Sequence, residues 1–537
     1  MRPVKKSLKY LLFTFLISLV LIQCAKRGNP TGGALDEDPP EILRAYPDNY
    51  TTNFDSKEIV IQFDEYVTFK DLNKQLVISP PMDYPPVILP QGGVSREVVI
   101  RIVDTLKDNT TYVMNFGQSL VDNNESNPYP YLKYVFSTGD YIDSLQLKGT
   151  INNVLEYDTS NFVNVLLYEI DSTYTDSAIY KENPDYVLNT LDSLQTFTLE
   201  NLRAGTYQMI ALKEENSDYR FDPSRDMIAF YPEPIMVPSD ETYELNLYKQ
   251  VADRRIARAT HEAKNRIHLG YYGELDSLNI HPLDSTLILE SRITRLEQKD
   301  TLQYWFKPTK DLDSILMKAS LREFEEEFQV KFKKDLEPDS LIISKTGKFS
   351  LAGDLEFTAA TPIENVDKSR MLLLDNDSLE KDISSTLDKF TNVASLDFER
   401  EENQRYQLAI YPGAITDFFG AKNPDTLNWK YSTRSTRDYG NVFVNLTGGK
   451  DFPVIVQVVS KNLKVLAEKT VTKNGVVEFD LIDPSDYYIR LIYDANKNGR
   501  YDPGNILNNQ QPERIEYLRK TINLKPNWDV NETINLD

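Results

Sequence analysis

The chain repeats itself, and this repetition constrains its fold more than any other feature of the sequence. Five residues return in the same order 280 positions later, so that Tyr207, Asn216, Arg220, Asp222 and Pro223 reappear as Tyr487, Asn496, Arg500, Asp502 and Pro503. A looser repeat, shifted by 294 or 295 positions, relates Phe63, Ile78, Tyr112, Asp122, Ser137 and Thr138 to Phe357, Leu372, Tyr406, Asp417, Ser432 and Thr433. Because self-similarity of this kind marks recurring structural units, we predict the order A, B, insert, A′, B′.

Short β-type runs fill the repeated blocks. In the first block they include residues 59–63, 98–102 and 111–116, and Pro, Gly, Asn or Asp separates the runs. Turn residues at a spacing of roughly 8 to 12 residues are typical of β-sandwiches. The single cysteine allows no disulfide within the chain, so packed apolar cores have to stabilise the units. We therefore predict an all-β chain of tandem β-sandwich modules.

Motifs in residues 38–140 resemble the S-layer-type bacterial Ig-like domain. They are Ile-x-Phe-Asp-Glu-x-Val at 61–67, Ile-Ser-Pro at 78–80, Asn-Thr-Thr-Tyr at 109–112 and Phe-Ser-Thr-Gly at 136–139. The strand and turn order of residues 145–250 is similar to the carboxypeptidase-regulatory or transthyretin-like β-sandwiches. Through the repeats, 345–437 is then a second, divergent Ig-like domain and 438–537 a second carboxypeptidase-regulatory-like sandwich. With the insert at 251–344, these segments are modules 1 to 5 in chain order.

Module 3, the insert, opens with the one basic cluster of the sequence. Residues 249–268 hold six Lys or Arg against two Asp or Glu, and Ile256, Ala259, Ala263 and Ile267 recur at helical spacing. This pattern predicts a short amphipathic basic helix, followed by strands. Its side chains Arg254, Arg255 and Arg258 are predicted to contact an acidic partner or lipid head groups. The alternative is a solvated helix face that links two sandwiches.

The N-terminus has the pattern of a secretion signal that ends at a lipidated cysteine. Basic residues precede an apolar run of 13 residues at 10–22, which is too short for an ordinary spanning helix. Residues 21–24, Leu-Ile-Gln-Cys, resemble the lipobox of bacterial lipoproteins, which implies cleavage after residue 23 and a covalent diacylglycerol at Cys24. Residues 24–37 are expected to form a flexible tether. Ala25 after the cysteine, in place of Asp, is similar to the enterobacterial pattern for passage to the outer membrane. Surface-exported lipoproteins of Bacteroidota-like bacteria carry acidic residues almost directly after the cysteine, whereas Lys26 and Arg27 come first here, so the periplasmic or cell-surface face stays open.

The mature chain is strongly acidic. Its formal charge changes from −22 to −26 on removal of residues 1–23, which hold four Lys or Arg and no Asp or Glu. Sequence-independent binding to nucleic acid depends on Lys and Arg that neutralise phosphates. We therefore expect membrane attachment through the lipid anchor, an envelope or outer-membrane protein as partner, and no nucleic acid.

A loop in module 5 has the beginning of a calcium-site pattern. Side-chain oxygens stand at alternate positions at Asp494, Asn496, Asn498 and Asp502, with Arg500 between the last two and Gly499 at the sixth position. Calcium prefers oxygen ligands at this spacing, but Asn505 stands where such loops carry a bidentate Glu. The alternative is an Asx-rich hairpin turn, stabilised by local hydrogen bonds.

The motifs of common catalytic sites are missing from the sequence. We find no nucleophile elbow, phosphate loop or dinucleotide fingerprint, and only three histidines. The loop at 122–134 mixes acidic and aromatic residues, and Asp122, Tyr129 and Tyr131 are its predicted partner contacts. We therefore predict a non-enzymatic outer-membrane lipoprotein that acts as a protein-binding scaffold, as an accessory subunit of a protein assembly, secretion or uptake complex. The alternative is a surface lipoprotein that binds or processes glycans.

Overall fold

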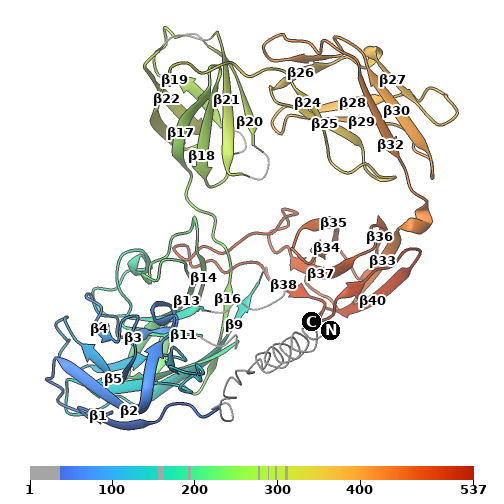
Figure 1. The fold of residues 1–537 in the computed structure, drawn as a ribbon. Coiled ribbons are helices and arrows are strands. Elements are labelled where there is room, and N and C mark those ends of the chain that lie inside the picture. The colour runs from blue at the N-terminus through green and yellow to red at the C-terminus, as the bar shows by residue number, and fades with distance from the viewer. Residues whose placement is uncertain are drawn as a thin grey trace, which may run out of the picture. The chain divides into compact units, whose positions relative to one another are not determined.

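The computed structural model describes residues 37–154, 162–190, 195–275, 278–287, 289–296, 299–308 and 312–536. The described elements are strands apart from the short helix α2 (Leu72–Gln75) and the 3-10 turns η1 (Ala178–Tyr180), η2 (Lys368–Arg370) and η3 (Thr436–Asp438) (Figure 1). The predicted all-β class with tandem sandwiches is confirmed. None of the helices in these ranges is long and apolar enough to cross a membrane.

Contacts between Cα atoms divide the described chain into two compact units. The first holds the residues up to Leu76 together with Met82–Tyr141, and the second holds Val77–Pro81 and the residues from Ile142 onward. The first unit is thus module 1 without the short strand β3 (Val77–Ser79). The second unit contains modules 2 to 5, whose boundaries stay a prediction.

Module 1 has a main sheet that begins at an edge strand. Its order is β1 (Ile42–Tyr46), β2 (Glu58–Phe69), β5 (Ser95–Arg101) and β4 (Val87–Leu89), with β7 (Leu120–Asp122) also on β2. Opposite lie β6 (Thr111–Asn115) and β8 (Lys133–Ser137), an antiparallel pair. Ile59, Ile61 and Phe63 alternate along β2 and are no more than 1% exposed, because successive strand residues point to opposite faces. The core therefore lies between the two sheets.

Modules 2 and 5 share one eight-strand topology, as the 280-residue repeat predicts. Module 2 has a sheet of β12 (Thr196–Leu202), β9 (Leu145–Asn153) and β16 (Thr242–Leu247), and a sheet of β11 (Tyr186–Asn189), β10 (Asn164–Glu169), β13 (Gly205–Lys213), β14 (Met227–Phe230) and β15 (Ile235–Val237). Module 5 has the corresponding two sheets. The smaller consists of β36 (Gly475–Ile482), β33 (Gly440–Thr447) and β40 (Asp529–Asn535). The larger consists of β35 (Val465–Val471), β34 (Val454–Ser460), β37 (Asp486–Tyr493), β38 (Ile515–Tyr517) and β39 (Ile522–Asn523). In each copy the first strand pairs in parallel with the last.

Module 3 is a sandwich of its own, with the sheets β17 (Arg255–Ala263), β18 (Arg266–Tyr272), β21 (Thr301–Lys307), β20 (Glu290–Arg295) and β19 (Asn279–Pro282), β22 (Ser314–Leu321), β23 (Phe324–Lys331). The predicted basic helix is wrong, because its residues form β17. The pairing of β17 with β18 shifts register between Ile256 and Arg258 and again between His261 and Ala263. Each bulge adds one residue to the strand. The buried positions Ile256, His261 and Ala263 are thus spaced irregularly, so the sequence does not show the alternation that is typical of a strand.

Module 4 repeats the plan of module 1 with one strand divided. Its first sheet consists of β24 (Ile343–Thr346), β25 (Leu355–Ala359), β29 (Val393–Asp397) and β28 (Ser384–Asp388). A second sheet pairs β26 (Ile363–Val366) with β31 (Ile415–Asp417), and a third consists of β27 (Met371–Leu374), β30 (Arg405–Ile410) and β32 (Leu427–Ser432). In module 1 Val67 of β2 faces Asp122, and in module 4 Ile363 of β26 faces Asp417. Strands β25 and β26 of module 4 together therefore correspond to the single strand β2 of module 1.

Module 5 packs against module 2 through the long loop between β37 and β38. Ile506 is 8% exposed and belongs to the apolar cluster on the outer face of the larger sheet of module 2. Its backbone N–H donates to Gln250 Oε1 at 3.0 Å, and Gln511 Nε2 donates to the carbonyl oxygen of Phe230 at 3.0 Å. A Cβ on Gly504 would lie 2.6 Å from Tyr248 Cζ, so only glycine allows this close approach. Residues 504–511 thus form an arm that joins the two copies of the repeat.

Candidate functional site

The predicted calcium loop folds on hydrogen bonds of its own. Asp494 is 2% exposed, and its two carboxylate oxygens accept the backbone N–H of Asn498 and of Gly499 at 3.0 and 2.8 Å. The side-chain amides of Asn496 and Asn498 both donate to Asp502 Oδ2, and the Arg500 N–H donates to Asn498 Oδ1. The described residues contain no group of three His, Cys, Asp or Glu placed to hold a metal ion. Calcium coordination stays a prediction, while the hydrogen bonds show that the loop shapes the base of the arm.

The first copy of this loop is built around Glu214. Its carboxylate accepts the Asn164 side-chain amide at 3.0 Å and the backbone N–H groups of Asp218 and Tyr219 at 2.9 and 3.0 Å. Burial raises the pKa of Glu214 to about 7, although these N–H donors oppose the shift and the Asp218 charge adds to it. Glu214 is therefore partly protonated near neutral pH.

The predicted contact loop of module 1 is held from inside by Asp122. This residue is 1% exposed, and its carboxylate accepts the backbone N–H groups of residues 124 to 127 at 2.6 to 3.0 Å. Burial alone would raise the pKa of Asp122, but the four donors outweigh it and lower the pKa. Asp122 is therefore corrected from a contact residue to the residue that positions the loop, because its oxygens face their own backbone.

The two predicted tyrosines of this loop differ in exposure. Tyr131 is 49% exposed, and its hydroxyl accepts from Asn115 Nδ2 at 2.6 Å. Tyr129 is half-buried, with its ring in an edge contact with Phe63 at 6.2 Å between centroids. Tyr131 is therefore the more accessible of the two.

Module 1 carries most of the exposed aromatic surface of the described chain. Among the described tyrosines, seven are exposed by more than a third, and six of these lie in module 1 or directly after it: Tyr46, Tyr50, Tyr66, Tyr84, Tyr131 and Tyr141, with Tyr411 in module 4 as the seventh. Three apolar side chains stand along β1, where Ile42, Leu43 and Tyr46 are 37%, 61% and 76% exposed. Strand β1 pairs only with β2 among the described strands, so it is an edge of its sheet. Edges with accessible backbone groups are sites of strand pairing between proteins.

The three arginines predicted to contact a partner lie in and before β17. All are exposed. Arg254 Nε donates to the carbonyl oxygen of Glu274 at 2.9 Å, and the Arg255 guanidinium lies over the Tyr272 ring at 4.5 Å. Arg258 pairs with Gly270 across the strands. Arg255 and Arg258 thus lie on β17, an edge strand among the described strands, and Arg254 directly precedes it, in place of the predicted helix face.

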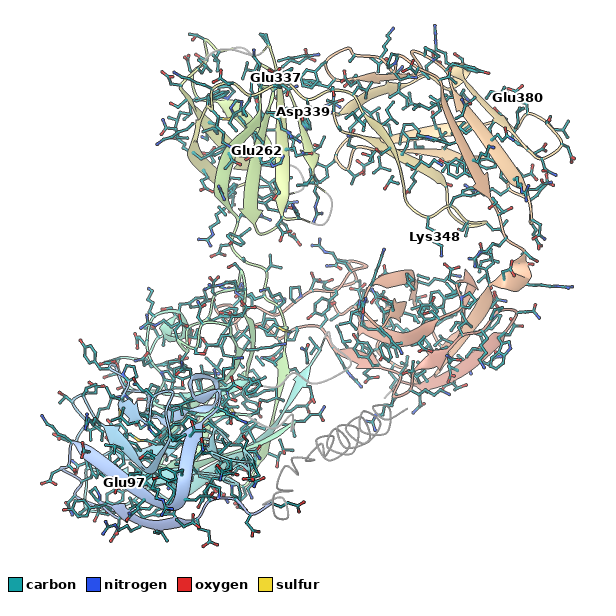
Figure 2. The ribbon with its side chains drawn as sticks, viewed as in Figure 1. Glu97, Glu262, Glu337, Asp339, Lys348 and Glu380 are labelled. Atoms are coloured by element: carbon teal, nitrogen blue, oxygen red, sulfur yellow. The ribbon has the colours of Figure 1, made fainter. Side chains whose placement is uncertain are left out.

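A cleft lies between modules 3 and 4. No motif in the sequence predicts this cleft. Its volume is about 840 Å³, and the lining residues include Arg266, Arg295, Gln303, Asp339, Glu356, Thr358, Thr386, Asp388 and Ser395. Asp339, labelled in Figure 2, stands in the segment that leads from β23 to module 4. Because these residues are separated by up to about 130 positions in the chain, no local sequence motif could predict the cleft.

The remaining predicted site residue, Cys24, lies outside the described residues. Its lipid anchor therefore stays a prediction.

Comparison with known proteins identifies one module. Residues 36–138 match the family model of the bacterial Ig-like domain. A search of the curated proteins found none that matches the chain.

Several solved structures resemble the chain distantly. They include surface layer protein SbsC, domains 1–6, with 10% identity over 91% of this chain and 67% of that chain (TM-score 0.16). Two others are the Bacillus anthracis TIE protein (10%, 94%, 76%, TM-score 0.15) and the N-terminal eight Ig domains of Down Syndrome Cell Adhesion Molecule (9%, 85%, 59%, TM-score 0.15). TM-scores this low support no argument about function. The family match stands on its own and concerns residues 36–138, which are similar to the bacterial Ig-like domain.

Proposed function

We propose that the chain is a non-enzymatic lipoprotein of the outer membrane, in which module 1 binds an envelope protein and the other modules serve as a scaffold. The setting we infer is an accessory subunit of a complex that assembles, secretes or imports proteins. Attachment would come from acyl chains on Cys24, since two or more buried chains hold a protein stably at a bilayer without a spanning helix.

The observation that supports this proposal best is the exposed apolar surface of module 1. Five of the seven most exposed tyrosines of the described chain lie there and a sixth, Tyr141, follows directly, and its edge strand β1 exposes Ile42, Leu43 and Tyr46. Aromatic side chains are enriched in protein interfaces because they bury a large area with little loss of conformational freedom. Exposed apolar residues that cluster in one module of a soluble sandwich mark it as an interaction site.

The test is affinity purification of the tagged, lipidated full chain from its own cells after mild cross-linking. We expect an outer-membrane protein to copurify with the wild type, and to be reduced at least about tenfold by Leu43→Ser with Tyr46→Ser, because interface anchors contribute about 2 kcal/mol or more each. Tyr411→Ser is the matched control, since Tyr411 is 42% exposed and lies in module 4. Capture that is equal for the edge variant and the control would refute module 1 as the contact.

A further inference from the structure

We propose that the cleft between modules 3 and 4 binds an oligosaccharide. This is a binding activity beyond the protein scaffold proposed above, and it uses a different part of the chain. The cleft volume of about 840 Å³ lies within the range of ligand sites.

The floor of the cleft is the solvent face of one sheet of module 4. One row of cross-strand neighbours runs Thr346, Glu356, Ser395 and Thr386, and the next row runs Thr358, Val393 and Asp388. The residues between them on these strands, Leu355, Phe357, Ala394 and Leu396, point into the core and are no more than 1% exposed. The sheet therefore presents a regular array of hydroxyl and carboxylate groups, because alternate strand residues share a face.

The opposite wall comes from module 3 and is held in place. Gln303 is 8% exposed, its Oε1 accepts from Thr294 Oγ1 at 3.1 Å, and its Nε2 lies 3.2 Å from His268 Nε2. The Thr294 hydroxyl in turn accepts from Trp305 Nε1 at 2.9 Å. Arg266 lies over the Trp305 ring and pairs with Asp339 at 3.1 Å. Side chains fixed in this way lose little freedom when a ligand binds.

Contacts between the two modules fix the width of the cleft. The Arg295 N–H donates to the carbonyl oxygen of Phe390 at 2.7 Å, and Arg292 pairs with Glu364 at 2.6 Å. Lys307 Nζ donates to the carbonyl oxygen of Phe418. The two walls are therefore joined by backbone and charged contacts at the cleft itself.

The chemistry of the lining selects the class of ligand. Arg266 and Arg295 stand against Asp339, Glu356 and Asp388, so the cleft has no positive excess for a phosphate or sulfate. Carboxylates and amide oxygens accept, guanidinium groups donate, and hydroxyls do both. A ligand that carries a hydroxyl at each position satisfies such a surface, and an oligosaccharide is a ligand of this kind.

A peptide fits the same cleft less well. Peptide recognition by sheets uses free backbone groups at an edge together with apolar pockets for side chains. Here the floor is a sheet face, whose backbone groups are paired within the ladder. The apolar side chains of the lining, Leu296, Ala359, Ala360 and Val393, are mostly small. The structure thus offers side-chain hydroxyls where a peptide would need backbone donors.

The experiment uses the lipidated full chain in a detergent without a sugar head group. The protein is first applied to a printed array of neutral, N-acetylated and acidic oligosaccharides, and the strongest binder is then titrated by calorimetry. The test variant combines Thr386→Val with Ser395→Ala, which removes two floor hydroxyls while keeping side-chain volume. The matched control combines Thr470→Val with Ser432→Ala, at exposed strand positions of other sheets that do not line the cleft.

We expect the floor variant to bind the selected oligosaccharide about 10- to 30-fold more weakly, as the loss of two neutral hydrogen bonds predicts. The control variant should bind like the wild type, and thermal unfolding should show that both variants fold. Absence of any oligosaccharide binding by the wild type would overturn the proposal. So would equal binding by the floor variant, or displacement of the sugar by an unrelated extended peptide. None of these outcomes bears on partner capture through module 1, so the two proposals fail separately.

Discussion

At the scale of single residues, the pKa values of two carboxylates of this chain are shifted in opposite directions. Asp122 accepts four backbone N–H donors, which favour its ionised form, outweigh the effect of burial and lower its pKa. Glu214 is half-buried and accepts two backbone N–H groups and the Asn164 side-chain amide. Desolvation, with the nearby Asp218 charge, outweighs these donors and raises the pKa of Glu214 to about 7. Both residues were visible in the sequence as acidic residues, but their hydrogen-bond partners were not.

We expect Glu214 to make the protein less stable as pH rises from about 4.5 to about 7. In this window Glu214 is ionised in the unfolded chain but still protonated in the folded protein, so folding takes up a proton. The free energy of unfolding therefore falls by about 1 to 3 kcal/mol as the pH rises through the window. Glu214→Gln should remove this dependence. Scanning calorimetry at pH 5.0 and 7.5 measures it, with Glu215→Gln at the exposed neighbour as the control. An unchanged difference between the two pH values in Glu214→Gln would contradict the assignment.

Asp122→Ala should destabilise the first unit by about 2 to 4 kcal/mol, because four N–H groups lose a charged acceptor and recover only part of that energy from water. Asp122→Asn should cost less, since one oxygen remains. The pKa of Asp122 is lowered, so its contribution is complete above about pH 4 and is lost as pH falls through the folded pKa. Urea unfolding followed by tyrosine emission measures the change, and Asp140→Ala at an exposed site serves as the control. A loss for Asp122→Ala no larger than that of the control would refute its role.

At the scale of elements, the structure of a strand or loop can depend on contacts that its own sequence does not reveal. Strand β17 has helical spacing in its apolar residues and still pairs with β18, because two bulges absorb the extra residues and cross-strand pairing outweighs local propensity. The Asx-rich loop of module 5 continues into the arm at 504–511, which packs on module 2. In both cases a partner element elsewhere in the chain decides the outcome.

Gly504→Val should detach the arm. A Cβ at this position meets Tyr248 Cζ at 2.6 Å and the carbonyl oxygen of Gln510 at 2.7 Å, so the backbone has to move away from module 2. Overpacking of this kind costs about 1 to 3 kcal/mol. Hydrogen exchange at Ile506, whose N–H is bonded to Gln250, should then become about 10- to 100-fold faster. Gly93→Ala is the control, because nothing lies within 4 Å of its Cβ. Unchanged protection at Ile506 would show that the arm is held by other contacts.

At the scale of the whole molecule, two modules with the same strand topology have different surfaces. Modules 2 and 5 share their strand order, including the parallel pairing of first and last strands, yet Leu166 and Ile210 on the outer face of module 2 are replaced in module 5 by Gln457 and Arg490, which bond to each other at 2.6 Å. An apolar face needs a cover, to which the arm of module 5 contributes Ile506 beside Ala178 and Ile179 of module 2. The two copies therefore differ where they meet.

Cys24→Ser should release the protein from the membrane. If acyl chains on Cys24 provide the attachment, the variant lacks a thiol for lipid transfer, and no helix among the described residues can replace the anchor. Fractionation of cells should move the protein from the outer membrane to the soluble fraction, and intact mass should lose the acyl groups. Ser7→Ala, in the predicted signal, is the control. Membrane association that survives Cys24→Ser would refute the anchor.

Local periodicity was enough to predict the all-β class, because strand alternation and turn chemistry are properties of neighbouring residues. The motifs of residues 38–140 pointed to the bacterial Ig-like domain, whose family model matches residues 36–138. Tertiary structure alone decided that residues 255–263 are a strand, that Asp122 faces inward, that residues 504–511 reach module 2 and that modules 3 and 4 enclose a cleft. Each of these depends on contacts between segments far apart in the chain. The free energy of such contacts depends on which surfaces meet, and a linear sequence does not contain that information in any local pattern.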